Sequence, residues 1–257
     1  MISRSISGRG GAQDTVRQCA SEVVYVALGL REDGYKEVLG FWIVGAEGES
    51  ALVWQDILAE SKERGLTEPL LFIGDGLKGL AEAVKEIYPL ADFQSCILHK
   101  VRTSLSKVRK KHREAVAEDM ERVYRQRDEA GCKAALAAFC QEWRVLYPEV
   151  TKSWERELPY LATYLSYPEE LRPSIYTTNI PERFIKEVKR RTKVIELFPH
   201  PDATAKVMYL VASEMNERYK RRLLSKWDRI NQKLHSIRTV KYGNQAIVDA
   251  FCLTQDS

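Results

Sequence analysis

Two apolar runs that flank an Asp-Gly pair narrow the possible folds of this chain more than any other pattern. Residues 22–30 (EVVYVALGL) and 36–44 (KEVLGFWIV) are rich in β-branched and apolar side chains, as strands are. Asp33-Gly34 between them is typical of a tight turn that joins antiparallel strands. We therefore expect a β-hairpin, followed by a helix that begins near Ala51 and is closed by Gly65.

The next segments add a strand–helix–strand unit and a long helical block. Residues 69–73 form a short apolar run without alternation, as in a buried central strand, and residues 92–95 predict one more strand. Between them, and from residue 96 to about 165, apolar side chains recur at helical spacing. This order predicts an α/β fold in which a mixed sheet is flanked by helices and interrupted by an all-helical insertion. The expected segments are an irregular N-terminus (1–20), the first part of the α/β core (21–95), the insertion (96–175), C-terminal core helices carrying Glu182 (176–225) and a tail (226–257).

The distribution of charge is more informative than its total. The chain has 40 Lys and Arg against 36 Asp and Glu, a net charge of +4. Three runs, at residues 100–113, 183–193 and 218–229, hold 19 of these basic residues and only two acids. Such runs are typical of surfaces that bind a phosphate backbone. The alternative is three solvated helix faces.

Several classes of protein are disfavoured by what the sequence lacks. No apolar stretch approaches the ~20 residues of a membrane span, and the N-terminus has no secretory signal pattern. The five cysteines are odd in number and scattered, which favours reduced thiols and a cytoplasmic protein. No G-x-S-x-G, Walker or H-E-x-x-H motif occurs, which argues against hydrolases, P-loop enzymes and zincins.

Two carboxylates stand where an α/β protein could hold a metal ion. Asp75 follows an apolar strand and is flanked by glycines, and Glu182 lies early in a predicted helix. Carboxylates are the ligands that Mg²⁺ prefers, and Mg²⁺ ions can stabilise both oxygens of a phosphodiester displacement. The structural alternatives are an N-cap at Asp75, for a helix beginning at Leu77, and a first-turn acid at Glu182.

Cys96 and His99 form a C-x-x-H motif. As a zinc signal it is weak, because no second pair stands at zinc-finger spacing. The alternative is a buried thiol beside a structural histidine.

Taken together, these motifs resemble the Mutator superfamily of bacterial insertion-sequence transposases. The resemblance rests on GYKEVLGFWI, DGLKGL, CILHKVR, YTTNIPE, RRTKV and FP, in that order from about residue 23 to 222. It implies a DDE transposase with an RNase H-like core, in which Asp75 is the second acid, Glu182 the third and Cys96 and His99 the family motif. It further implies Mg²⁺ or Mn²⁺ as cofactor, held by Asp75 and Glu182. Basic residues near these motifs are expected to bind DNA: Lys100, Arg102, Arg183, Lys186, Lys189, Arg190, Arg191 and Lys193.

The chain departs from the family pattern at the first acid, which the resemblance places on a strand before the hairpin. The family pattern places this acid a fixed distance before an arginine that Arg17 matches. In this sequence that position is Gly10, which is not acidic. Asp14 is the only acid before Glu22, and its neighbours lack a strand pattern. We therefore expect the first acid to be missing, with Asp14 as the alternative, in an N-terminally truncated member of the family.

The expected function is metal-dependent cleavage and strand transfer at insertion-sequence ends, impaired by the missing acid. The expected partners are terminal inverted repeats, target DNA and, for an active protein, further copies of the chain. A catalytically inactive DNA-binding or transposase-interacting protein is the main alternative, and a stand-alone RNase H-like nuclease ranks below it.

Overall fold

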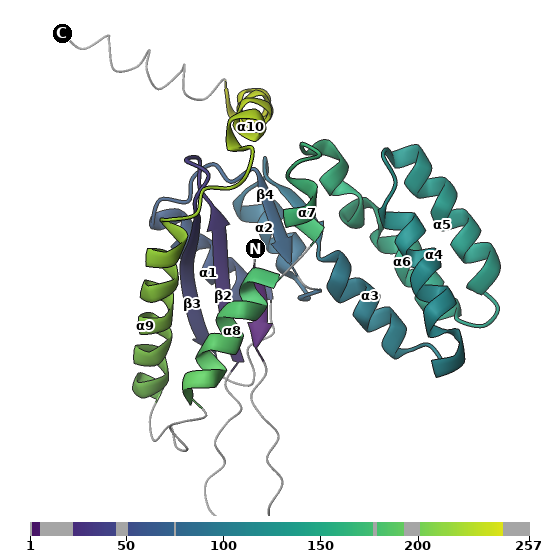
Figure 1. The fold of residues 1–257 in the computed structure, drawn as a ribbon, viewed down its shortest axis with the longest axis horizontal. Coiled ribbons are helices and arrows are strands. Elements are labelled where there is room, and N and C mark those ends of the chain that lie inside the picture. The colour runs from purple at the N-terminus through teal and green to yellow at the C-terminus, as the bar shows by residue number, and fades with distance from the viewer. Residues whose placement is uncertain are drawn as a thin grey trace, which may run out of the picture. The chain divides into compact units, whose positions relative to one another are not determined.

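The computed structural model describes residues 2–5, 23–44, 51–74, 76–176, 179–192 and 201–243 (Figure 1). Contacts within the chain divide it into two compact units. The first comprises Met1–Leu66, Leu77–Ala83 and Thr178–Trp227, and the second comprises Thr67–Gly76, Val84–Thr177 and Asp228–Ser257. Among the helices that the structure describes, none combines the length and apolar composition needed to cross a bilayer.

The first unit contains the predicted hairpin. Strands β2 (Val23–Leu30) and β3 (Lys36–Val44) pair antiparallel, with a bulge between Ala27 and Leu28. Gly34 adopts φ +83°, the left-handed conformation that an Asp-Gly turn supplies without a steric penalty. The predicted hairpin is therefore confirmed, and it forms here because Gly34 accepts the backbone conformation that the turn requires.

A short strand at the N-terminus corrects one prediction. Residues 1–20 were expected to be irregular, but β1 (Ile2–Ser5) pairs antiparallel with β2, Ile2 opposite Ala27 and Ser5 opposite Val24. Four residues of sequence ISRS are too short and too polar to show a strand period, whereas the pairing depends on backbone groups that any sequence has. None of the four residues of β1 is acidic.

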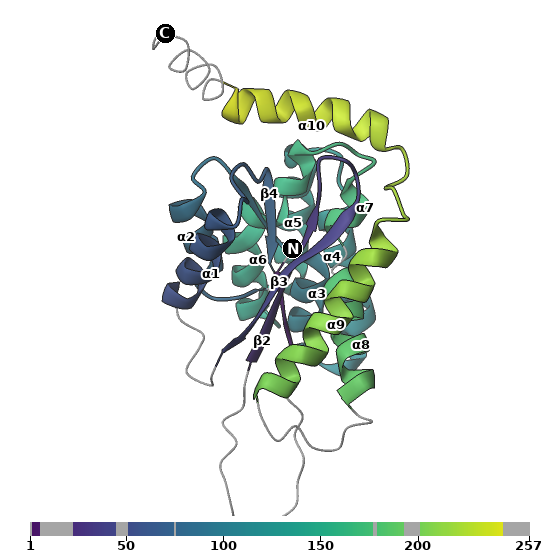
Figure 2. The same ribbon diagram turned by 90° about the vertical axis from the view of Figure 1, so that its left-hand side faces the viewer.

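Helices cover both faces of this sheet (Figures 1 and 2). Helices α8 (Asn179–Thr192) and α9 (Pro201–Tyr219) lie on one face, where apolar side chains of both helices and of alternate strand positions form a buried cluster. Helix α1 (Ala51–Glu63) lies on the other face, where Trp54 packs edge-on against Tyr25 with ring centroids 4.4 Å apart. Because successive side chains of a strand point to opposite faces of the sheet, the same strands contribute side chains to both of these contacts. The buried cluster contains Val26, Leu28, Val38, Phe184, Met208, Val211 and Met215.

The second unit contains a parallel pair of strands, β4 (Leu71–Gly74) and β5 (Asp92–Ser95), in register from Leu71–Asp92 to Gly74–Ser95. The connection between them includes α2 (Leu80–Ile87). Parallel strands need such a crossover connection, because a tight turn reverses the chain direction. The strands expected at residues 69–73 and 92–95 are thus confirmed.

The chain after β5 is helical as far as Tyr176, as the apolar spacing predicts. Its elements are α3 (Ile97–Ser106), the 3₁₀ turn η1 (Lys110–His112), α4 (Arg113–Tyr124), α5 (Glu129–Trp143), α6 (Pro148–Leu161), the 3₁₀ turn η2 (Thr163–Ser166) and α7 (Arg172–Tyr176). Trp154 and Phe139 pack at the centre with ring centroids 5.8 Å apart. The all-helical insertion therefore has a core of its own.

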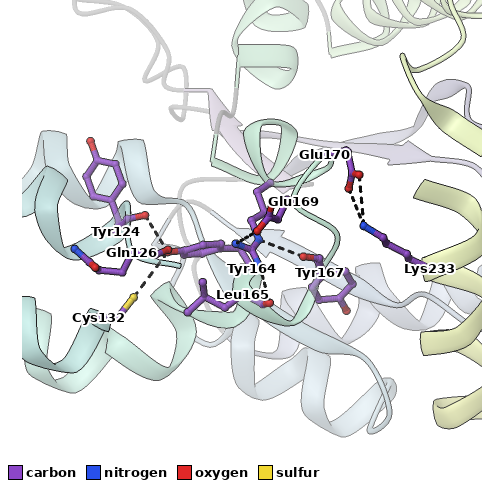
Figure 3. A network of polar contacts seen from close by, with 10 residues as sticks. Tyr124, Gln126, Cys132, Tyr164, Leu165, Tyr167, Glu169, Glu170 and Lys233 are labelled. Atoms are coloured by element: carbon purple, nitrogen blue, oxygen red, sulfur yellow. Dashed lines mark hydrogen bonds and ion pairs between the residues drawn. The ribbon is translucent and has the colours of Figure 1, made fainter. Parts of the chain in front are cut away.

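Tyr164 of η2 joins the helices of the insertion to one another (Figure 3). Its hydroxyl donates to the carbonyl of Tyr124 at 2.9 Å and lies 3.8 Å from the Cys132 sulfur. Its backbone N–H donates to the side chain of Gln94, on β5, at 2.7 Å. Gln94 is fully buried and also donates to the carbonyl of Leu161 at 3.1 Å. This amide therefore fixes the insertion to the strand from which it emerges.

The segment predicted as a tail, residues 226–257, begins with a docked helix. Helix α10 (Trp227–Tyr242) belongs to the second unit from Asp228 onward. Arg238 forms an ion pair with Glu68 at 2.7 Å, and the Tyr242 hydroxyl donates to the carbonyl of Pro69 at 2.7 Å. This segment thus begins with a helix held by long-range polar contacts, which the local sequence does not reveal.

Candidate functional site

The loop after β4 is the first candidate site. Asp75 itself lies outside the described residues, but both neighbours are placed. Gly74 ends β4, and its carbonyl accepts the N–H of Cys96 at 2.7 Å. Gly76 adopts φ +76°. A side chain there would be strained, so the glycine is required by the path of the loop.

The helix that follows the Asp75 loop begins later than the sequence predicts. Helix α2 begins at Leu80 rather than Leu77. An N-cap side chain accepts from backbone groups two or three positions beyond it, so a cap for α2 must stand close to Leu80. Asp75 itself lies outside the described residues, so its capping alternative stays a hypothesis.

The C-x-x-H motif is a helix cap that brings a histidine to this loop. Cys96 is the N-cap of α3, and its sulfur accepts the backbone N–H of His99 at 3.4 Å. The imidazole of His99 lies against Gly76, 3.3 Å from where a Cβ would stand. Within the described part of the chain, no group of three His, Cys, Asp or Glu side chains could hold a metal ion. The Cys96 thiol is buried and caps α3.

Helix α8 carries Glu182, whose side-chain position is outside the described set. The helix is fixed by Phe184, which is completely buried in the cluster beneath it, and by the half-buried Val188. Pro181 in the first turn is tolerated because the first N–H groups of a helix have no intrahelical partner. Glu182 thus stands on a rigidly packed helix.

The basic side chains of α8 differ in whether they form an ion pair with another described residue. Arg183 and Lys186 are exposed, and no ion pair is seen for either within the described residues. Arg190 pairs with Glu187 at 2.9 Å, one turn earlier. Arg191 donates two hydrogen bonds to Glu214 of α9, which raise the pKa of Arg191 and lower that of Glu214.

The expected DNA contacts on α8 are therefore best placed at Arg183 and Lys186. Arg191 is hydrogen-bonded to Glu214 of α9, so a contact between Arg191 and DNA would have to displace this carboxylate. The side chain of Lys189 and the whole of Lys193 lie outside the described residues.

Lys36, at the start of β3, is a cation that the sequence did not single out. Partial burial and, secondarily, the charge of Arg183 lower the pKa of Lys36. The effect shows that two cations from distant segments lie close together. No sequence pattern could have identified Lys36, because a lone lysine at the edge of a hairpin is ordinary.

Lys100 was expected to bind DNA, and the structure corrects this. Its side chain is only 9% exposed, and its ammonium lies 2.7 Å from Glu157 and contacts Ser153, both on α6. Burial lowers the pKa of Lys100, partly offset by Glu157. The lysine points inward because α6 packs against α3, a tertiary contact that the basic run conceals. Arg102, two residues on, is exposed.

Comparisons with known proteins agree with the motifs. A family model described as "Transposase, Mutator family" matches residues 13–222. The chain is 38% identical over 202 residues to a transposase for insertion sequence element ISRM3 of Rhizobium meliloti (strain 1021), covering 78% of this chain and 50% of that protein. It is 36% identical over 178 residues to a transposase for IS1201 of Lactobacillus helveticus (69% and 48%), and 32% identical over 204 residues to one for IS905 of Lactococcus lactis subsp. lactis (strain IL1403) (79% and 51%). The chain thus spans about half the length of the curated relatives it matches.

Proposed function

Because the chain belongs to the Mutator family of transposases, we propose that it acts in DNA transposition through an RNase H-like core that cleaves and joins DNA at insertion-sequence ends. The observation that carries the proposal is the family match over residues 13–222, a span that includes Asp75 and Glu182. The α/β arrangement supports it, since Asp75 directly follows a strand in the sheet. Open α/β sheets place their sites at such strand ends.

Asp75 and Glu182 are the proposed holders of Mg²⁺ or Mn²⁺. The donor set suits a hard cation, because both side chains offer carboxylate oxygens. At Gly76, the described atoms that lie within 4 Å of where a Cβ would stand belong to the His99 ring. A bound metal would stabilise the negative charge that develops on the phosphodiester. Phe184 keeps the helix of Glu182 fixed on its sheet, so that the backbone of this helix does not need to be ordered on binding.

Exposed cations of the first unit would hold the DNA backbone. Arg183 stands one residue after Glu182 and lies close to Lys36, and Lys186 follows one turn later on α8. Clustered cations without acidic partners attract phosphates independently of base sequence. The proposed partners are therefore terminal inverted repeats and target DNA, engaged by a homo-oligomer.

A second candidate function is DNA binding without catalysis, and the composition of β1 favours it. The first acid of the family was expected on a strand before the hairpin, and β1 pairs with the first hairpin strand without an acidic residue. Asp14 lies outside the described residues. With two carboxylates rather than three, we expect weak cleavage or none.

Cleavage of a supercoiled plasmid tests both functions. The plasmid carries the terminal repeats of the element, and the assay contains Mg²⁺ or Mn²⁺. Nicking that is lost in Asp75→Asn and in Glu182→Gln, but kept in Glu142→Gln, an exposed control on α5, supports the metal-dependent enzyme. Retention of nicking in both site variants would refute the assignment. Binding to duplex DNA without nicking would establish the second function.

A further inference from the structure

A cationic elbow joins α3 to α4 in the helical insertion. It comprises residues 107–113 (KVRKKHR). These residues run from Lys107, the C-cap of α3, through η1 to Arg113, the first residue of α4. All five Lys and Arg side chains of this cationic elbow are exposed: Lys107, Arg109, Lys110, Lys111 and Arg113.

These cations differ from most other exposed cations of the insertion in that no ion pair is seen for them in the described part of the chain. Within the described residues no ion pair involves any of the five, and Glu114 is the one adjacent acid along the chain. Elsewhere on the insertion, four exposed cations pair with acids three or four residues earlier in the chain. These pairs are Arg122–Asp119, Arg125–Glu121, Lys133–Glu129 and Lys152–Glu149. Positive potential is therefore concentrated at the elbow.

The backbone of the cationic elbow is held in place by the buried Val108 and by partly buried hydrogen bonds. Val108 is 3% exposed, and its carbonyl accepts the Arg113 Nε–H at 3.1 Å. The hydroxyl of the buried Tyr147 accepts the backbone N–H of Arg109 at 3.3 Å and lies 2.6 Å from Nδ1 of His112. A rigid backbone presents the charges without the entropic cost of ordering a loop on binding.

We propose that the cationic elbow is a second DNA-backbone contact, made by the insertion in addition to the contacts on α8. The inference rests on the proposed function, since it assigns a further surface for the same DNA. Duplex DNA fits better than a membrane surface, because the one apolar side chain of the elbow, Val108, is buried. Membrane-surface segments combine cations with exposed apolar side chains. The elbow offers only charge, which is what phosphates require.

The test compares two variants of the full chain that lose the same number of charges. The elbow variant carries Lys107→Gln, Arg109→Gln, Lys110→Gln and Lys111→Gln, and keeps Arg113 because its Nε holds the carbonyl of Val108. The control variant neutralises four paired cations of the same insertion: Arg122→Gln, Arg125→Gln, Lys133→Gln and Lys152→Gln. The dissociation constant for a labelled duplex of an element end is measured by fluorescence anisotropy across a salt series.

Each lost phosphate contact should reduce the slope of log K against log salt by about 0.9. We expect the elbow variant to lose about 2 to 4 in slope, and at least roughly tenfold in affinity at low salt. The control variant should change the slope by less than about 1. An isocharge variant, with the three lysines changed to Arg and Arg109→Lys, should keep the parent slope. A pair variant, Lys110→Gln with Lys111→Gln, gives a second measurement if the quadruple variant does not fold.

The outcomes separate the two proposals. If the parent chain does not bind duplex DNA at low salt, the proposed function fails and the elbow contact fails with it. If the parent binds and the elbow and control variants change alike, the elbow contact is wrong while the proposed function stands. If the elbow variant loses affinity for polyglutamate but keeps its affinity for DNA, the surface serves an acidic protein and the inference is also wrong.

Discussion

Replacement of Gln94 by Met should weaken the attachment of the insertion to β5. The side chain of Gln94 is fully buried and satisfies three backbone groups: the N–H of Tyr164 at 2.7 Å and the carbonyls of Leu161 at 3.1 Å and Ser95 at 2.8 Å. Methionine has nearly the same volume and fills the space, but it can neither accept nor donate a strong hydrogen bond. The perturbation therefore removes the polar contacts with little change in packing.

The expected loss of unfolding free energy is about 2–6 kcal/mol. The bonds to Tyr164 and Leu161 are buried, so Gln94→Met leaves two backbone groups without partners and out of reach of water. Each such group costs about 1–3 kcal/mol. The bond to Ser95 is only partly buried, so that carbonyl can hydrate and adds little.

Urea unfolding measures this effect, with tryptophan fluorescence as the probe because Trp143 and Trp154 lie within the insertion. With a slope m of about 2 kcal/mol per M, the midpoint should fall by roughly 1–3 M. The control is Gln141→Met, the same substitution at an exposed position of α5. A Gln94→Met midpoint within ~0.3 M of the parent would refute the reasoning.

Three further predictions concern residues with well-defined surroundings. Lys100→Met should lower the free energy of unfolding by about 1–3 kcal/mol, because Glu157 loses one of its two cationic partners but keeps Arg156 and is 29% exposed. It should leave the salt slope of DNA binding unchanged, and a slope reduced by about 1 would restore Lys100 as a DNA contact. Phe184→Ala should cost about 3–5 kcal/mol in urea unfolding by opening a cavity under α8, and a loss below ~1 kcal/mol would contradict that packing. Burial raises the pKa of Tyr88 to about 12 and raises that of Tyr167. The folded state thus favours the protonated phenols, so the urea midpoint of the parent should stay constant up to pH 10 and fall above it. The fall should be less steep in Tyr167→Phe, which lacks one of these phenols. A midpoint that rises above pH 10 would contradict the prediction.

Local features of the sequence were sufficient for most of the elements. Asp33-Gly34 predicts the hairpin because glycine accepts a positive φ at no cost, and Gly34 has one. The apolar spacing of the insertion predicts its helices because their buried faces follow that period. Strand β1 escaped prediction because four residues carry no period, and their pairing with β2 is a long-range backbone contact.

The candidate site was predicted less completely. The glycine-flanked Asp75 and the C-x-x-H motif were both visible in the sequence, but their proximity through His99 and Gly76 was not. A basic run gives the positions of charges along the chain and not the direction in which each points. Within one run, Lys100 turns into a buried ion pair while Lys110 and Lys111 remain exposed.

The sequence by itself determined the order of strands and helices, the family and the identity of the candidate carboxylates, because turn residues, side-chain periodicity and motif spacing are local properties. The tertiary structure decided which cations are neutralised and which face solvent, that α2 begins at Leu80, and that β1 and α10 are parts of the fold. These properties depend on contacts between residues far apart in the chain. Burial and ion pairing are set by what packs against a side chain, which no local pattern specifies.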